Sequence, residues 1–251
     1  MGKILVIGDS CKDIHVYGSC KRLAPDSPVP VFVPTDEKRN EGMAANVHRN
    51  IISLGAQADL KTNTVLTEKK RYVEKKTNHM FIRVDSGEER VARIENLSRS
   101  LLDQYELVVV SDYNKGFLTE CDIEFICRNH PLVFIDSKKK IGDFCEDWSF
   151  LKINKDEYEQ SQEYLDAAPW CKKKLLVTLS SHGCRFKDKM YPVKNVEIKD
   201  LCGAGDSFLA ALCVKYLESQ SIEQSIVFAN DCATQVVQQR GVNVVKMPWR
   251  Y

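Results

Sequence analysis

A regular alternation of short apolar segments with amphipathic segments constrains the fold most strongly. Apolar, β-branched runs predict buried strands at residues 3–7, 106–110, 132–135, 150–153 and 175–179. Helical periodicity occupies residues 44–54, 119–128, 204–217 and 222–239. Alternation of this kind favours an open, mostly parallel α/β sheet with right-handed crossovers.

Two stretches depart from this rhythm. Residues 14–20 and 29–33 alternate like half-exposed strands around a proline-rich turn, and residues 71–76 and 80–84 read as a hairpin. Extra strands of this kind can form a small lid against the main sheet. We therefore expect one domain over residues 1–251, with lid strands from about 14–35 and from 69–85.

Composition and charge narrow the classes of function. The 251 residues carry a formal net charge of +1, so no overall field favours nucleic acid or a membrane surface as a partner. Apolar runs are too short to span a bilayer, and residues 1–8 read as a strand rather than a signal sequence. The ten cysteines include no Cys-x-x-Cys pair. We expect a cytoplasmic protein in a reducing compartment, without a disulfide framework or a metal cage.

A glycine-rich segment, Asp200-Leu-Cys-Gly203-Ala204-Gly205-Asp206, leads into one of the predicted helices. The first N–H groups of such a helix have no intrahelical partners, and with the helix dipole they form an anion hole suited to a phosphoryl group. A carboxylate at Asp206 would lie at the mouth of this hole and could accept the proton of an attacking hydroxyl. The motif alone leaves open an aspartate that merely caps the helix.

The motifs taken together resemble the ribokinase-like (PfkB) family of sugar kinases, from residue 4 to about residue 245. The segment that ends in Asp206-Ser-Phe matches the family's C-terminal signature, whose last aspartate is the catalytic base. The resemblance implies an ATP-dependent sugar kinase with a Rossmann-like three-layer α/β sandwich and a small β-strand lid. Gly203, Ala204 and Gly205 are then the anion hole beside the catalytic Asp206.

Two N-terminal segments resemble a particular branch of that family. Gly8-Asp9-Ser-Cys-Lys-Asp13, with Ser111-Asp112-Tyr113-Asn-Lys-Gly116 farther on, is similar to the kinases of D-glycero-D-manno-heptose 7-phosphate, which act on the anomeric hydroxyl. Asp9 and Asp13 follow the first predicted strand, at the edge where open α/β sheets place ligands. Both are expected to bind sugar hydroxyls; loop aspartates that satisfy turn amides are the alternative.

The resemblance extends to a further sugar-binding element and to a substrate phosphate. Glu41-Gly42-Met43-Ala-Ala-Asn46 corresponds to the family's Gly-Gly-x-x-Asn element, so Gly42 and Asn46 are expected contacts, although Met43 replaces the second glycine. A substrate phosphate requires Arg or Lys partners. The candidates are Arg83, Lys138, Lys69, Lys70 and Arg71, although exposed hairpin charge is the default interpretation of Lys69 and Lys70.

Asn154-Lys-Asp-Glu157 matches the family's Asn-x-x-Glu motif, which organises Mg²⁺ and phosphate, often through water. Magnesium favours oxygen ligands and keeps several waters, so Glu157 is the expected metal contact. Without the resemblance, the pair would be read as a helix cap and a first-turn acid. The ATP contacts that the resemblance implies are Asn154, Thr178, Ser180, Gly183, Asn230 and Gly241.

The expected reaction is in-line transfer of the γ-phosphoryl group from MgATP to a sugar or sugar-phosphate hydroxyl. A kinase for another sugar and a catalytically weak nucleotide-binding regulatory protein are the alternatives. One departure from the family leaves these alternatives open. Members of the family usually carry another strand–loop–helix unit between the segments that correspond to residues 56–61 and 67–72, whereas here only residues 62–66 connect them. Since lids in this family often pair between subunits, a homodimer through the lid is also expected.

Overall fold

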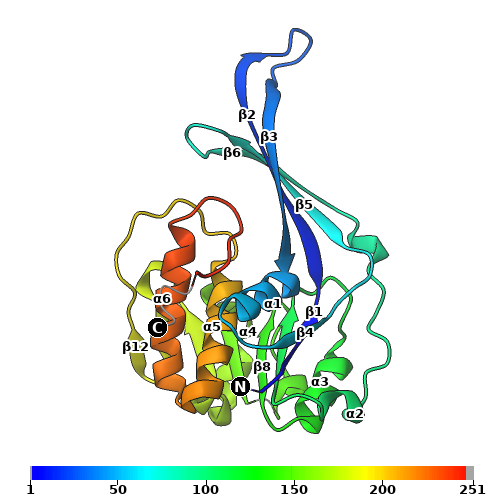
Figure 1. Cartoon of the computed structure of the whole chain (residues 1–251), viewed down its shortest axis with the longest axis vertical. Coiled ribbons are helices and arrows are strands. Elements are labelled where there is room, and N and C mark those ends of the chain that lie inside the picture. Colours follow the sequence, from blue (N-terminus) through cyan, green and yellow to red (C-terminus); the bar gives the residue numbers. More distant parts are fainter. Residues whose placement is uncertain (1, 148, 247–251) are drawn as a thin grey trace.

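The computed structural model describes residues 2–147 and 149–246, and it contains an eight-stranded sheet of order β12-β11-β10-β9-β8-β7-β1-β4 (Figure 1). Within this sheet the neighbouring strands β10, β9, β8, β7, β1 and β4 run parallel to one another. Strands β11 and β12 continue the sheet in antiparallel pairing. Their bounds are β1 Ile4–Gly8, β4 Ala58–Lys61, β7 Leu107–Asp112, β8 Val133–Ser137, β9 Phe150–Asn154, β10 Leu175–Thr178, β11 Cys184–Phe186 and β12 Lys189–Tyr191.

Helices cover both faces of this sheet. Strand β1 shows why, because Ile4 and Val6 pack into one apolar core while Leu5 and Ile7 pack into another on the opposite face. The first core contains α1 (Ala44–Ser53), α5 (Ala204–Ser219) and α6 (Ile222–Val237). The second contains α2 (Arg99–Leu102), α3 (Glu120–Asn129) and α4 (Lys155–Ala167). This helix–sheet–helix arrangement confirms the predicted three-layer sandwich. Short 3₁₀ helices lie at Glu88–Arg90, Asp143–Cys145, Pro169–Lys173 and Ser180–His182.

A second sheet, of order β3-β2-β5-β6, projects from the sandwich as the predicted lid (Figure 1). It consists of β2 (Ser10–Leu23), β3 (Pro30–Met43), β5 (Thr67–Glu74) and β6 (Met80–Ser86). Its strands are longer than predicted, because backbone pairing between β2 and β3 continues from Ser10 opposite Met43 through the polar, mostly charged residues 36–41. The apolar alternation used for the prediction covers only part of that paired length.

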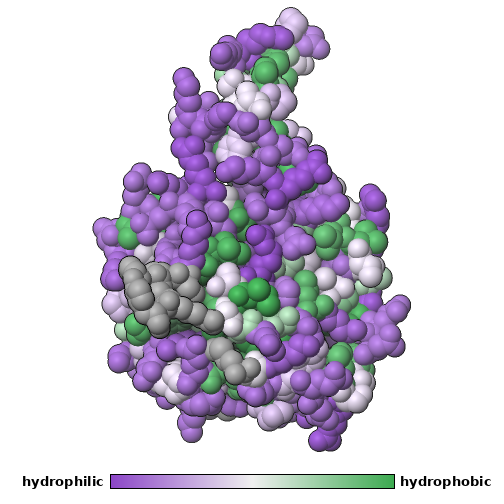
Figure 2. Space-filling view, in the orientation of Figure 1, coloured by the Kyte–Doolittle hydropathy of each residue, from purple (hydrophilic) through white to green (hydrophobic). Residues whose placement is uncertain are grey.

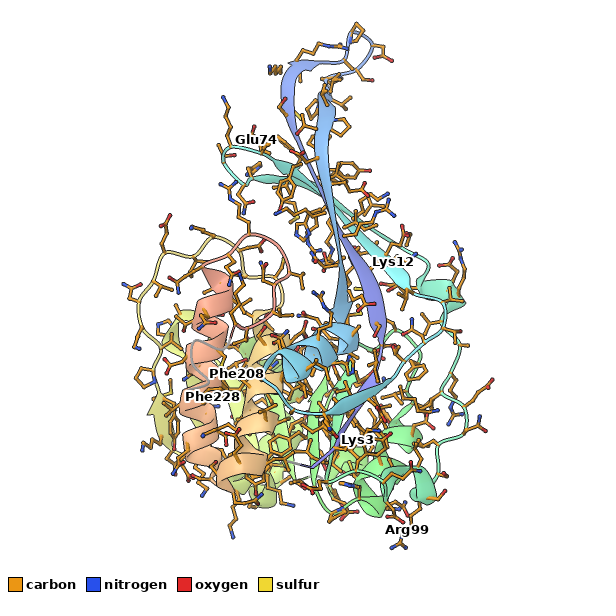
Figure 3. All side chains as sticks on the ribbon, in the orientation of Figure 1. Lys3, Lys12, Glu74, Arg99, Phe208 and Phe228 are labelled. Carbon is orange, nitrogen blue, oxygen red and sulfur yellow. The ribbon has the colours of Figure 1, made fainter. Side chains whose placement is uncertain are left out.

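The carboxyl ends of the parallel strands face the lid. Lys3, just before β1, lies with Arg99 at the end of the molecule away from the lid, whereas Lys12, shortly after β1, and Glu74 belong to the lid (Figure 3). Since β1 therefore runs toward the lid, so do its parallel neighbours. Ligands of open α/β sheets bind at this edge, so the site is sought between the lid and the strand ends.

The ten cysteines are all free thiols, most of them buried in the core. In the described ranges 2–147 and 149–246, no helix combines the length and the apolar character that crossing a membrane requires.

Candidate active site

The glycine-rich segment forms the turn that starts α5. Gly203 adopts a left-handed conformation with φ 79°, and a Cβ atom there would lie 2.8 Å from Asn46 Nδ2, so a side chain is excluded on two grounds. Gly203 also offers no side chain to cap the first-turn amides of α5. The Ala204 amide donates to the Leu201 carbonyl at 3.3 Å, so the following amides of this turn are the candidates for an anion hole.

Asp206 lies in that first turn and is only 5% exposed. Two donors fix its carboxylate: Asn46 Nδ2 donates to Oδ2 at 2.9 Å, and the Tyr113 hydroxyl donates to Oδ1 at 2.6 Å. Burial raises the pKa of Asp206 above that of an ordinary aspartate, although both hydrogen bonds and the Lys152 ammonium oppose the shift. A buried, oriented carboxylate with a raised pKa suits a general base.

The lid supplies the other wall of this site. Asp13, on β2, is buried and contacts the Arg71 guanidinium of β5. Gly42 lies beside it, because a Cβ atom at Gly42 would be 3.4 Å from Asp13 Oδ2. The same Cβ atom would lie 2.8 Å from Cys11 Sγ. The structure therefore joins the predicted residues in two pairs, Gly42 with Asp13 and Asn46 with Asp206.

Asp9 lies directly after β1, as predicted, and is engaged with backbone amides. Its carboxylate accepts the backbone amides of Tyr113, Lys115 and Phe117, at 2.8, 3.3 and 3.2 Å. The alternative of a loop aspartate that satisfies turn amides therefore describes its contacts. Its role in the site is to hold the loop that carries Tyr113.

A cavity of about 640 Å³ opens on the other side of Asp206. Ala204 and Gly205 of the anion hole line it, as do the predicted ATP contacts Asn154, Thr178, Ser180, Gly183 and Asn230. Gly241 lies apart from this cavity: its amide donates to Asp200 at 2.9 Å, and it faces the Tyr17 hydroxyl of the lid. The prediction for Gly241 thus has no support from its position.

A buried ion pair in this cavity, Lys152 with Asp136, was not predicted from the sequence. Lys152, only 4% exposed, lies 3.3 Å from where a Cβ atom of Gly205 would be, and its ammonium pairs with Asp136 at 2.5 Å. The position of Lys152 inside the apolar run of β9 could have predicted this ion pair, because a charged side chain is rarely buried without a partner. A buried cation beside an anion hole fits a phosphate group.

The remaining predicted residues are engaged with neighbours. Asn154 and Glu157 form a reciprocal capping box at the start of α4, and Glu157 also contacts the Lys138 ammonium. Lys138 lines the nucleotide-side cavity rather than the lid side. Arg83, on β6, makes a bidentate pair with Asp85 at 2.8 and 2.7 Å and lies opposite Arg71 across the strands.

Met43 ends β3 and precedes α1 with φ 62° and ψ −133°. This backbone conformation is one that essentially only glycine adopts without strain. The family's glycine at this position therefore has a physical reason, and the chain retains the conformation with a methionine.

A buried carboxylate at a helix N-terminus, next to residues that line a cavity of about 640 Å³, suits enzymes that transfer a phosphoryl group to a hydroxyl. The model of the pfkB family of carbohydrate kinases matches residues 60–250, and the chain belongs to this family.

Curated relatives and solved structures agree with the family. The chain is 33% identical over 296 positions to the Bifunctional protein HldE of Helicobacter pylori strain J99 and 30% identical over 289 positions to that of Nitratiruptor. It spans 64% and 62% of the length of these relatives, and 96% and 95% of the chain is covered. The 296-position alignment exceeds the chain's 251 residues by 45, so the relative has at least that many positions without a counterpart.

Among solved structures, a nucleoside kinase of Methanocaldococcus jannaschii superposes with a TM-score of 0.74 at 19% identity, covering 98% of this chain and 95% of that one. The ribokinase of Arabidopsis thaliana, complexed with ribose and ATP, superposes with a TM-score of 0.73 at 16% identity, covering 96% and 94%. These likenesses confirm the predicted ribokinase-like fold.

Proposed function

We propose that the protein transfers the γ-phosphoryl group of ATP to a hydroxyl of a sugar phosphate, and that D-glycero-D-manno-heptose 7-phosphate, phosphorylated at its anomeric hydroxyl, is the acceptor. The observation that carries the kinase proposal is the position of Asp206, which is buried in the first turn of α5 next to Ala204 and Gly205, two residues that line the cavity. Family membership supports the same reaction class.

In the proposed reaction the acceptor oxygen attacks the γ-phosphorus and forms a new O–P bond. The bond to the leaving ADP oxygen breaks, and the acceptor proton passes to Asp206. The first-turn amides of α5 and the Lys152 ammonium stabilise the negative charge on the transferring group. The lid covers the acceptor and limits the entry of water.

The residues present fit Mg²⁺ through water. Asn154 and Glu157 offer oxygen atoms at the end of β9, but the Glu157 carboxylate already accepts Asn154 and Lys138 donors. Direct coordination would displace the Lys138 ammonium, whereas a metal-bound water needs only a remaining lone pair. When bound, Mg²⁺ neutralises phosphate charge on the ATP.

The heptose-phosphate acceptor rests on the likeness to the HldE relatives and on the basic lid residues. Arg71 and Lys69 of β5 and Arg83 of β6 belong to the inner lid face, near Asp13, where a sugar phosphate would extend. Met43, at the position of a glycine, favours a second candidate, an acceptor of different shape.

A panel of acceptors in a coupled ADP-release assay separates these candidates. The proposal predicts that the heptose 7-phosphate gives the highest kcat/KM, and that ³¹P NMR of its product shows a new anomeric phosphate. A higher kcat/KM for another sugar would reject the heptose assignment, while ADP release with no acceptor of the panel, despite ATP binding, would favour a regulatory protein.

We also propose a homodimer through the lid. The lid exposes apolar side chains that isolated monomers rarely gather on one arm; they are Leu23, Val29, Val33, Met80, Ile82 and Val84. Hydrophobic atoms occur toward the end of the projecting arm on the face drawn in Figure 2. Sedimentation velocity tests this: a single monomeric species at micromolar concentration contradicts it. The free thiols support the cytoplasm as the place of action.

A further inference from the structure

The hydrogen bond between Tyr113 and Asp206 has no role in the reaction as described. The Tyr113 hydroxyl donates to Asp206 Oδ1 at 2.6 Å, and Asn46 occupies the other carboxylate oxygen. A phenol O–H on the base is chemically the same arrangement as a sugar O–H awaiting deprotonation. The two hydroxyls therefore compete for one oxygen of Asp206.

The surroundings of Tyr113 favour a side chain that moves while its backbone stays fixed. The Tyr113 amide donates to the buried Asp9 carboxylate at 2.8 Å, which holds the main chain in place. The ring lines the nucleotide-side cavity, which leaves space on one side of it. Rotation about the side-chain torsions can therefore withdraw the hydroxyl without unfolding the loop.

Two lysines link this ring to the lid and to the nucleotide side. Lys69 Nζ, from lid strand β5, lies 5.1 Å from the ring centroid, and Lys138 Nζ, from the end of β8, lies 5.3 Å from it. Cations at this distance are attracted by an aromatic face. Displacement of the lid or binding of a phosphate changes the position of these ammonium groups, and so changes what holds the ring.

We infer that Tyr113 is a gate: in the free enzyme its hydroxyl holds the place on Asp206 that the acceptor hydroxyl takes during transfer. This rests on the proposed kinase function. The phenol occupies one acceptor site of Asp206 Oδ1, so water must compete with it for the base, and ATP bound without an acceptor is hydrolysed more slowly. A correctly bound sugar displaces the phenol and gains the base.

Tyr113→Phe tests the gate, because it removes the hydroxyl and leaves the ring. Tyr105→Phe is the matched control, because the Tyr105 hydroxyl also donates to an aspartate, Asp59, at 2.7 Å. Tyr105 lies just before β7, beside Lys3, at the end of the molecule away from the lid (Figure 3).

The first readout is ADP release from ATP without any sugar. Tyr113→Phe leaves a gap next to Oδ1 that admits a water molecule, whose oxygen can attack the γ-phosphorus while its proton passes to Asp206. We expect this rate to rise about tenfold or more over wild type, the ratio that corresponds to one charge-assisted hydrogen bond, and the acceptor KM to fall. Tyr105→Phe should leave both unchanged.

The second readout is the pKa of Asp206, followed by ¹³C NMR of labelled aspartate and assigned with Asp206→Asn. Loss of the Tyr113 donor should raise this pKa further, since the hydrogen bond stabilises the carboxylate. Neither Tyr113→Phe nor Tyr105→Phe changes the other groups around Asp206. These groups are Asn46 on α1, Cys11 on β2, Asp136 on β8 and Lys152 on β9.

The two readouts separate the gate from the proposed function. If the pKa rises in Tyr113→Phe but wild type phosphorylates no acceptor, the kinase proposal fails while the contact of Tyr113 with Asp206 stands. If wild type is an active kinase, and Tyr113→Phe leaves the sugar-free ADP release and the pKa at wild-type values, Tyr113 is only a packing residue and the inference is overturned.

Discussion

The backbone at Met43 leads to a prediction that opposes the usual effect of glycine. Met43 has φ 62° and ψ −133° at the junction of β3 and α1, and its side chain is 3% exposed. Holding a non-glycine residue in such a region costs about 1–3 kcal/mol. Met43→Ala and Met43→Gly both remove the buried side chain, so the difference between the two variants isolates the backbone.

Met43→Gly removes the backbone strain of the folded state. Relative to Met43→Ala, it also raises the conformational entropy of the unfolded chain, which lowers the free energy of unfolding by about 0.4–1 kcal/mol. The free energy of unfolding of Met43→Gly should therefore exceed that of Met43→Ala by about 0.5–2 kcal/mol. Both variants should be less stable than wild type, because deleting a buried methionine side chain typically costs about 2–5 kcal/mol.

Urea unfolding followed by circular dichroism measures these differences, provided that the m-values agree. Ala45→Gly, two residues farther into α1, is the control: without a positive φ, glycine should lower the stability by about 1 kcal/mol relative to alanine. Equal stability of the Gly and Ala variants at position 43, or greater stability of the Ala variant, would refute the account of strain at this junction.

Three further predictions concern the anion hole, the buried ion pair and the base. Gly203→Ala should lower kcat at least tenfold in steady-state assays, because its Cβ atom would lie 2.8 Å from Asn46 Nδ2 and displace a donor of Asp206; an unchanged kcat would contradict this. Asp136→Asn should lower the free energy of unfolding by about 3–5 kcal/mol in urea titrations, since the buried Lys152 ammonium loses its carboxylate partner; a loss below about 1 kcal/mol would show that the pair is dispensable. The acid limb of kcat/KM should reflect the raised pKa of Asp206: the base is active when ionised, so activity falls as the pH drops through a value above the ordinary aspartate pKa of about 3.9, and a limb at or below that value would argue against Asp206.

The main sheet and most of its helices could be predicted because their signals are local. Runs such as residues 106–110 are apolar enough to specify buried strands. Helix α4 was predicted only as an alternative reading of Asn154 and Glu157, because its buried residues include Glu157 and Ser161 and so give a weak apolar stripe. Strands β11 and β12 have three residues each, too short for a periodic pattern.

The site was partly predictable for a different reason. Motifs identified Asp206 and Asn46 separately, but only the folded chain shows that a hydrogen bond joins them across 160 positions. Tyr113 lay within a recognised motif without an assigned role, since its partner Asp206 is 93 positions away in the sequence. The contacts of Lys138 could not be predicted, because its partner Glu157 lies beyond the next strand, at the start of α4.

The central claim is that Asp206 removes the proton of the acceptor hydroxyl. Asp206→Asn keeps the shape of the side chain and a hydrogen-bonding oxygen, so the variant should fold and bind ATP with wild-type affinity by isothermal titration calorimetry. With saturating MgATP and the best acceptor of the panel, its kcat should fall by about 10²–10⁴, the usual contribution of a general base. A kcat near wild type, at unchanged ATP affinity, would contradict the assignment of Asp206 as the base.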